Sequence, residues 1–198
     1  MRIVVVGASG TLGKAAVNAL QQNHDIIQAS RNGEVQVDLS NPASIKAMYA
    51  QVTDIDAVVC AAGDARFGPL QALTDADFDL SLSNKLMGQI NLVRYGQEHL
   101  NESGVFTLTT GMLAHMPNAA TVMLTMINRA LEAFVEAAAL DMPKNQRLNA
   151  VCSPMAKETA EKMGWGPGGV PAAEIAKYYV QSLQGDLNGA LIGPAHTD

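Results

Sequence analysis

Short runs of β-branched and other apolar residues alternate along the chain with longer amphipathic or wholly apolar stretches. This alternation is typical of a parallel sheet whose two faces are both covered by helices. The short runs predict strands near residues 2–6, 26–30, 35–38, 55–60, 104–109, 147–152 and 189–192. The longer stretches predict helices near residues 11–22, 42–51, 74–100 with a break near Ser83, 118–142 and 172–184. We therefore expect the α/β fold class, as a doubly wound parallel sheet in a single domain of residues 1–198.

Two of these segments do not fit the simple alternation. Only about four residues separate the second strand from the third, so the segment 35–38 is expected to be a stub, because a parallel crossover normally needs a dozen residues or more. The helix at 118–142 is apolar on nearly every face and must be buried on more than one side. A partner subunit could supply the second side. We therefore expect a homo-oligomer that uses the helices near 84–100 and 118–142.

Composition narrows the function classes. The 198 residues carry a net charge of −6 spread along the chain without a basic run, which argues against a nucleic-acid partner. Cys60 and Cys152 lie in apolar stretches with no CxxC and no nearby His pair, so we expect buried thiols and no metal site. The first apolar run, MRIVVVGASG, enters a glycine loop too soon for a signal peptide or a membrane span. A cytoplasmic protein without a membrane partner is expected.

The strongest motif is VVVGASGTLGK, in which a strand leads through Gly7, Gly10 and Gly13 into a helix. Small residues here let the backbone turn off the strand, approach a pyrophosphate and pack the helix closely against the sheet. The pattern predicts a Rossmann-type dinucleotide site. A P-loop is excluded, since residue 8 is alanine and Ala15 follows Lys14 where a P-loop needs Ser or Thr.

The end of the second strand, IIQASR, indicates which dinucleotide binds. NAD-selective sites place an acidic side chain here for the ribose 2′-hydroxyl, whereas a cation favours the 2′-phosphate of NADP. Ser30, Arg31 and Asn32 offer a hydroxyl, a guanidinium and an amide. The planar donor fork of Arg31 suits a phosphate, so the sequence favours NADP(H). A solvated loop arginine is the alternative.

At these positions the chain resembles the short-chain dehydrogenase/reductase family in order and spacing. The resemblance covers nearly the whole chain and rests on the glycine loop, Asp38-Leu39, Cys60-Ala61-Ala62-Gly63, Asn84 after Asp77-Phe78, and RLNAVCSP at 147–154. It implies that Asp38 meets the adenine amino group and that the backbone of Ala61, Ala62 and Gly63 lines the adenosine ribose. It also implies that Thr159, five residues after Pro154, reaches the nicotinamide carboxamide, although Met155 stands where the family usually has Gly.

The residues expected to hold NADP(H) therefore come from the loops that follow the predicted strands. They are Gly7, Ser9, Gly10, Thr11, Leu12, Gly13, Ser30, Arg31, Asn32, Asp38, Leu39, Ala61, Ala62, Gly63, Pro154 and Thr159.

The chain departs from the family at its catalytic centre. Family members use a Tyr as general acid/base, with a Lys four residues later whose ammonium lowers the phenol pKa. Aligning NRALEAF with the segment that normally starts at the Lys puts Leu124 in the Tyr position and Asn128 in the Lys position. No tyrosine lies between Tyr95 and Tyr178. Thr110, at the end of the fifth strand, can still replace the family's substrate-orienting Ser.

Three other polar residues are candidates near the catalytic centre. His115 follows the fifth strand, where the cleft should open, and imidazole suits acid–base work at neutral pH; a solvated loop histidine is the alternative. Residue type favours Asn84 as the family's helix Asn, whereas alignment on Gly88 favours Lys85. A surface position is the favoured interpretation of Lys85. The segment 155–171 resembles the family's mobile substrate loop, with Trp165 as a lid anchor, or else is an ordinary surface loop.

Two functions remain. One is an NADP-dependent oxidoreductase that acts on an unknown carbonyl or alcohol with an unusual proton donor, for which Thr110, Asn84 and His115 are the catalytic candidates. The other is a non-catalytic NADP(H)-binding sensor or scaffold, which explains Leu124 and Asn128 directly.

Overall fold

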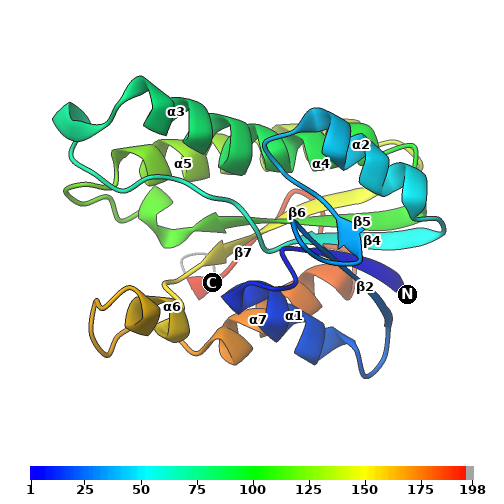
Figure 1. Ribbon diagram of the computed structural model, residues 1–198. Helices are drawn as coiled ribbons and strands as arrows, with labels where there is room; N and C mark the ends of the chain where they lie inside the picture. Colours follow the sequence, from blue (N-terminus) through cyan, green and yellow to red (C-terminus); the bar gives the residue numbers. More distant parts are fainter. Residues whose placement is uncertain (195–198) are drawn as a thin grey trace.

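The computed structural model describes residues 1–194, which fold around a seven-stranded parallel sheet (Figure 1). The strands run in the order β3-β2-β1-β4-β5-β6-β7. The chain thus winds from β1 first toward one edge and later toward the other, which confirms the predicted doubly wound α/β fold. The strands are β1 (Arg2–Val6), β2 (Asp25–Ser30), β3 (Val35–Gln36), β4 (Ile55–Cys60), β5 (Leu100–Gly111), β6 (Arg147–Ser153) and β7 (Leu191–Ile192).

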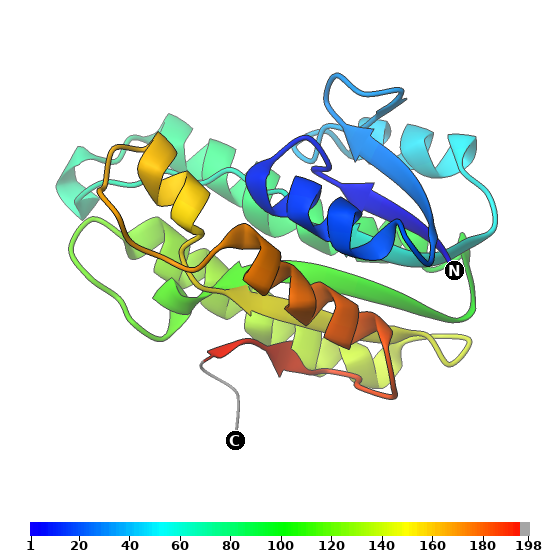
Figure 2. The ribbon, with the colours of Figure 1, turned by 90° about the horizontal axis from the view of Figure 1, so that it is seen from below.

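Helices cover both faces of the sheet (Figures 1 and 2). One layer holds α2 (Pro42–Gln51), α3 (Asp75–Ser81), α4 (Gly88–Gly96) and α5 (Val122–Ala138); the other holds α1 (Thr11–Leu20), α6 (Lys157–Lys162) and α7 (Ala172–Leu183). Each layer closes a separate apolar core, with Leu92 and Ile127 in the first and Val17 and Ile175 in the second. A π-helical turn, Leu82–Met87, joins α3 to α4.

The predicted elements are confirmed with a few changes of boundary. β3 is the expected stub, and it pairs only with the last two residues of β2, so its short connection never has to return to the start of that strand. The predicted break near Ser83 is the π-helical turn. Leu100, expected at the end of a helix, instead begins β5. The segment 155–171, expected to be a loop, contains the short helix α6.

The helix expected to be apolar on nearly every face is amphipathic. Met123 and Leu131 are buried against the sheet, while the outer face combines exposed Met126 with the charged residues Arg129 and Glu136. Burial on one side is therefore sufficient to explain most of this helix. Within residues 1–194, no helix is long and apolar enough to cross a membrane.

The contact between α1 and the end of β1 requires glycine at two positions. Gly7 has a φ of +84°, and a Cβ there would lie 2.6 Å from the Cβ of Ala62. A Cβ on Gly13, in the first turn of α1, would overlap the backbone carbonyl of Gly7. The glycine spacing noted in the sequence thus allows the helix to start directly against the strand it follows.

We expect Gly13→Ala to lower the free energy of unfolding by at least about 1–3 kcal/mol, because the added methyl group displaces backbone. This loss would occur although alanine is normally the better helix residue. Urea unfolding measures the effect. Gly168→Ala is the matched control, since nothing lies within 4 Å of its Cβ position, and it should change stability by less than about 1 kcal/mol. Equal effects of the two substitutions would contradict this account of the contact.

Candidate functional site

A cavity of about 270 Å³ lies at the carboxyl ends of β1, β2 and β4. This is where the strand order reverses, and open α/β sheets bind ligands at that point. Eleven of the residues expected to hold the cofactor or serve the reaction line this cavity, together with Val6, Val37 and Asp64. The eleven are Gly7, Ser9, Gly10, Ser30, Arg31, Asp38, Leu39, Ala61, Ala62, Gly63 and Asn84.

The N-terminus of α1 opens at the glycine loop. Gly10 occupies the N-cap position, no side chain caps this end of the helix, and its first turn carries no acidic residue. Backbone N–H groups at such an end, together with the helix dipole, bind anions. Thr11 and Leu12 belong to this first turn and do not line the cavity, so any contribution from them comes through the backbone.

Two side chains after β2 give the cavity its charge pattern. Arg31 is exposed at the rim, and among residues 1–194 it forms no ion pair. Its guanidinium is therefore free to meet an anion. One oxygen of Asp38, Oδ1, accepts hydrogen bonds from the backbone N–H and the hydroxyl of Ser40 at 3.0 and 2.6 Å. Asn32 lines a different hollow beside β2.

The remaining cofactor candidates lie away from this cavity. Pro154 follows β6, and Thr159 lies in α6, where its backbone N–H donates to the carbonyl of Ala156. Neither residue lines the cavity. Trp165, after α6, packs edge to face on Phe67 with ring centroids 5.2 Å apart. The loop 155–171 is thus joined by one aromatic contact to the segment that follows β4.

Lys85 is buried, with 8% of its surface exposed, so its interpretation as a surface lysine is wrong. The π-helical turn points it inward, and its side chain packs against Gly63, where an added Cβ would lie 3.0 Å from the Lys85 Cγ. Burial lowers the pKa of Lys85, against the opposing effects of Cys60 and Asp64. Single-turn π-helices are frequent at functional sites.

Asn84 points elsewhere than Lys85 and remains at the cavity. Its Oδ1 accepts a hydrogen bond from the backbone N–H of Asp64 at 2.8 Å. This bond holds the loop after β4 against the π-helical turn. The two adjacent residues therefore both serve the region, one at the cavity wall and one in the interior.

Gln89, which sequence reasoning missed, fixes this turn to the sheet. Its Oε1 accepts from the backbone N–H of Thr109 at 2.8 Å, and its Nε2 donates to the carbonyls of Thr109 and Lys85 at 3.0 and 3.2 Å. Gln89 is fully buried. The hydroxyl of Thr109 in turn donates to the carbonyl of Cys60 at 2.5 Å, so the ends of β4 and β5 and the π-helical turn form one network.

A second group of polar side chains lies where β5 and β6 end, on the α5 side of the sheet. Glu132 Oε1 lies 3.1 Å from His115 Nε2 and accepts from the hydroxyl of Thr110 at 3.3 Å. His115, Glu132 and Cys152 bring one potential ligand atom each within 4.8 Å of one another. Burial, reinforced by the Glu132 carboxylate, raises the pKa of the Cys152 thiol to about 11. Both cysteines are free and buried, as predicted.

Thr110 and His115 are therefore brought together, but neither lines the cofactor cavity. Glu132 was missed by sequence reasoning. Its signal was present, because Asn128 and Glu132 stand one turn apart in an otherwise apolar helix, where buried polar residues have a reason to be retained. Asn128 is buried and donates to the carbonyl of Gly111 at 3.3 Å, so it has a structural contact of its own.

The fold is of the Rossmann type, and the cavity lies where such folds bind dinucleotides. A model of short-chain dehydrogenases, described as "Enoyl-(Acyl carrier protein) reductase", matches residues 1–180. The chain therefore belongs to the short-chain dehydrogenase/reductase family, as the sequence motifs indicated. A search of curated proteins found no match.

Solved structures share the fold of this chain. The structure of the protein lin1944 from Listeria innocua is 40% identical, with a TM-score of 0.92 over 96% of this chain and 98% of that chain. Two more distant structures share the fold. A short chain dehydrogenase from Burkholderia cenocepacia in complex with NADP is 21% identical, with a TM-score of 0.83 over 96% of this chain and 94% of that chain. A small-chain dehydrogenase in complex with NADPH is 22% identical, with a TM-score of 0.87 over 97% and 95%.

Proposed function

We propose that this protein is an NADP(H)-dependent oxidoreductase that acts on a carbonyl or alcohol substrate. The observation that carries the proposal is the cavity at the sheet's reversal point, where a helix N-terminus without a side-chain cap meets an arginine that has no ion pair among residues 1–194. These features fit the pyrophosphate and the 2′-phosphate of NADP(H). The dehydrogenases in complex with NADP and NADPH that share this fold support the same assignment.

In this proposal different groups of residues bind different parts of the cofactor. The backbone of the glycine loop binds the pyrophosphate, while Ser30, Arg31 and Asn32 meet the 2′-phosphate. Asp38 and the Ala61–Gly63 backbone hold the adenosine end. Pro154 and Thr159 hold the nicotinamide end. The bound cofactor supplies hydride chemistry, and the protein supplies orientation and protons.

Because the sequence alignment puts Leu124 at the family's tyrosine position, the proposal assigns proton transfer to another group. We propose Lys85, because this buried lysine packs its side chain against Gly63 of the cavity wall, and its main-chain carbonyl accepts a hydrogen bond from Gln89. Burial lowers the pKa of Lys85, which makes its ammonium a stronger acid than that of an exposed lysine, and the proposal requires Nζ to reach the substrate oxygen from its interior position. Asn84 and Thr110 orient the substrate. His115 is the second candidate for the donor, held by Glu132.

A non-catalytic NADP(H) sensor or scaffold is the alternative. The observation that favours it is Asn128, which the sequence alignment puts at the family's lysine position and whose amide donates a hydrogen bond to the carbonyl of Gly111. A sensor would bind NADPH at the same cavity and turn over no carbonyl or alcohol substrate. Screening such substrates while following the absorbance of NADPH distinguishes the two functions.

We expect NADPH to bind more tightly than NADH, because only the 2′-phosphate can use the Arg31 guanidinium. Arg31→Ala should remove most of that difference and leave NADH affinity nearly unchanged. Fluorescence titration of the reduced nicotinamide measures both constants. Arg94→Ala is the matched control, since Arg94 lies on α4 and does not line the cavity. Equal affinity of the unmutated protein for the two cofactors would exclude the NADP assignment.

For the proton donor, we expect Lys85→Met to lower kcat by about 10²–10⁴-fold with little change in NADPH affinity. In the unmutated enzyme, carbonyl reduction should fall as pH rises through the pKa of Lys85, because only the ammonium donates. Burial lowers this pKa, so the fall should come at a lower pH than an exposed lysine would give. Lys85→Arg should shift this fall in the pH–rate profile to higher pH, because a guanidinium stays protonated to higher pH than an ammonium.

Lys177→Met is the control for Lys85→Met, because Lys177 is exposed on α7, where it pairs with Glu174 of the same helix. It should retain full kcat. His115→Ala separates the two donor candidates: if it lowers kcat by the same factor while Lys85→Met does not, the donor is His115.

We also propose that the chain forms a homo-oligomer through the helices near 84–100 and 118–142. The outer faces of these helices carry exposed Met87, Val122, Met126 and Leu140. Burying them against a second copy would remove apolar surface from water. Light scattering at micromolar concentration should give a multiple of the chain mass, and Met126→Glu should shift it toward the monomer. A monomer in the unmutated protein would contradict the proposal.

A further inference from the structure

We propose that His115, Glu132 and Cys152 bind a transition-metal dication of the Zn²⁺ type, at a site separate from the cofactor cavity. The three residues come from three segments: the loop after β5, the middle of α5 and the end of β6. Imidazole, carboxylate and thiolate are the ligand types that Zn²⁺ uses in proteins. No single stretch of sequence shows this set, because its members are 17 and 20 residues apart.

The geometry is close to what such an ion needs. The three ligand atoms lie within 4.8 Å of one another. Tetrahedral Zn²⁺ with bonds of about 2.0–2.3 Å would hold its ligand atoms roughly 3.3–3.8 Å apart. The largest separation must therefore close by about 1 Å, a movement within reach of side-chain rotation. His115 and Glu132 already approach to 3.1 Å.

Glu132 gives an independent indication that a ligand is bound here. The residue is 97% buried, with 3% of its surface exposed. Its Oε1 is engaged by His115 and Thr110, but its Oε2 is buried and accepts no hydrogen bond within the described structure. The Arg129 guanidinium lies 3.7 Å from Oε2, beyond hydrogen-bonding distance. A buried carboxylate oxygen without a donor is costly, and a metal ion would satisfy it.

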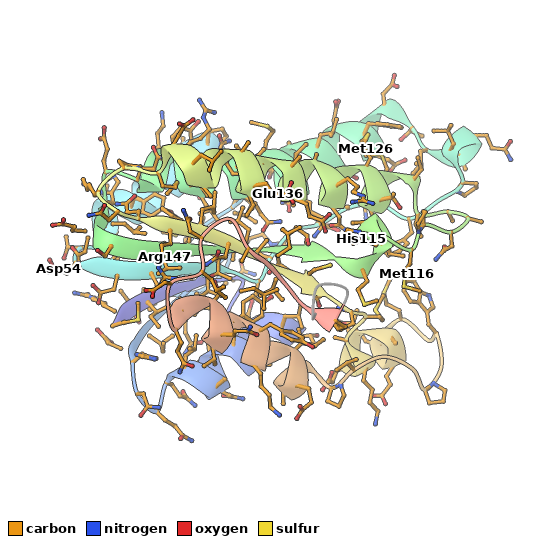
Figure 3. The ribbon with its side chains drawn as sticks, turned by 180° about the vertical axis from the view of Figure 1, so that it is seen from behind. Asp54, His115, Met116, Met126, Glu136 and Arg147 are labelled. Atoms are coloured by element: carbon orange, nitrogen blue, oxygen red, sulfur yellow. The ribbon has the colours of Figure 1, made fainter. Side chains whose placement is uncertain are left out.

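The site is open to solvent on one side. His115 and Glu132 line a cavity of about 650 Å³ together with Arg129, Glu136 and Leu191. Figure 3 shows His115 and Glu136 on the same side of the molecule, seen from behind. The cavity provides a path of entry and room for water as a fourth ligand, as in zinc sites with three protein ligands. It shares no lining residue with the cofactor cavity.

The charges favour a dication. Glu132, Glu136 and a Cys152 thiolate would carry three negative charges, against one positive charge on Arg129. Binding breaks the S–H bond of Cys152, forms a metal–sulfur bond and releases one proton to solvent. Thr110, which donates to Glu132, would orient the carboxylate as an outer partner of the metal. The thiolate also selects Zn²⁺ or Co²⁺ over Mg²⁺ and Ca²⁺, which prefer oxygen ligands.

The test uses the full chain, freed of metal by a chelator and titrated with Co²⁺. We expect one Co²⁺ per chain and a thiolate-to-cobalt charge-transfer band. One equivalent of Zn²⁺ should displace the Co²⁺ and remove the band. Cys152→Ser should abolish the band. Cys60→Ser is the matched control, because Cys60 is equally buried but outside the cluster, and it should retain the band.

Affinity for Zn²⁺, measured by competition with a chromophoric chelator, gives a second readout. His115→Ala and Glu132→Gln should each weaken binding by at least about 10²-fold, and Thr110→Val by about 10–100-fold, as for outer partners of metals. His99→Ala should leave it unchanged, since His99 stacks on Tyr49 away from the site.

No Co²⁺ binding at micromolar protein would overturn the proposal. So would equal binding by the unmutated chain, Cys152→Ser and His115→Ala, which would identify adventitious surface binding. Neither result bears on NADPH affinity, so the metal site and the proposed function fail separately.

Discussion

The close packing of α1 against the end of β1 is the contact on which the cofactor cavity depends. Only residues without a Cβ at positions 7 and 13 allow the helix to begin within van der Waals contact of the strand. That position brings the helix N-terminus to the point where the strand order reverses. A displacement of the helix by the size of one methyl group would move its N–H groups away from any phosphate held there. The cavity is therefore a consequence of backbone contact more than of side-chain chemistry.

Buried polar groups at the strand ends then determine what can react. A buried amide or carboxylate is retained only where its hydrogen bonds are made or where a ligand completes them. Gln89 is the first kind, with both ends of its amide used by Thr109 and Lys85. Glu132 is the second kind, with one oxygen left over. Gln89 thus supports the proposed active site structurally, whereas Glu132 belongs to a site that a ligand would complete.

The sequence predicted the fold and the cofactor cavity because both rest on local signals. The glycine loop and Arg31 are read directly from their positions after strands, and the structure brings them to one cavity. Lys85 could not be placed in this way. One extra residue in the π-helical turn changes which side chain points inward, and the choice between Asn84 and Lys85 depends on that turn.

The cluster at Glu132 was out of reach for a different reason. His115, Glu132 and Cys152 meet only because β5 and β6 lie side by side, with Thr110 opposite Cys152 in the register, and α5 packs over them. The spacing of these residues along the sequence does not indicate that their side chains lie together. The lack of a nearby His pair in the sequence therefore does not limit which side chains meet Cys152 in the fold.

The short pairing of β3 with β2 has a consequence for this edge of the sheet. β3 covers only Ala29 and Ser30 of β2, so along Asp25–Gln28 the described chain offers no strand partner on that side. An unpaired edge of a strand is a template for aggregation, and natural proteins protect such edges with charged side chains and irregular shape. Here the exposed Asp25 and Gln28 side chains flank the half-buried Ile26 and Ile27. Aggregation at high protein concentration should therefore depend on this edge of β2, and Gln28→Lys would protect the edge further.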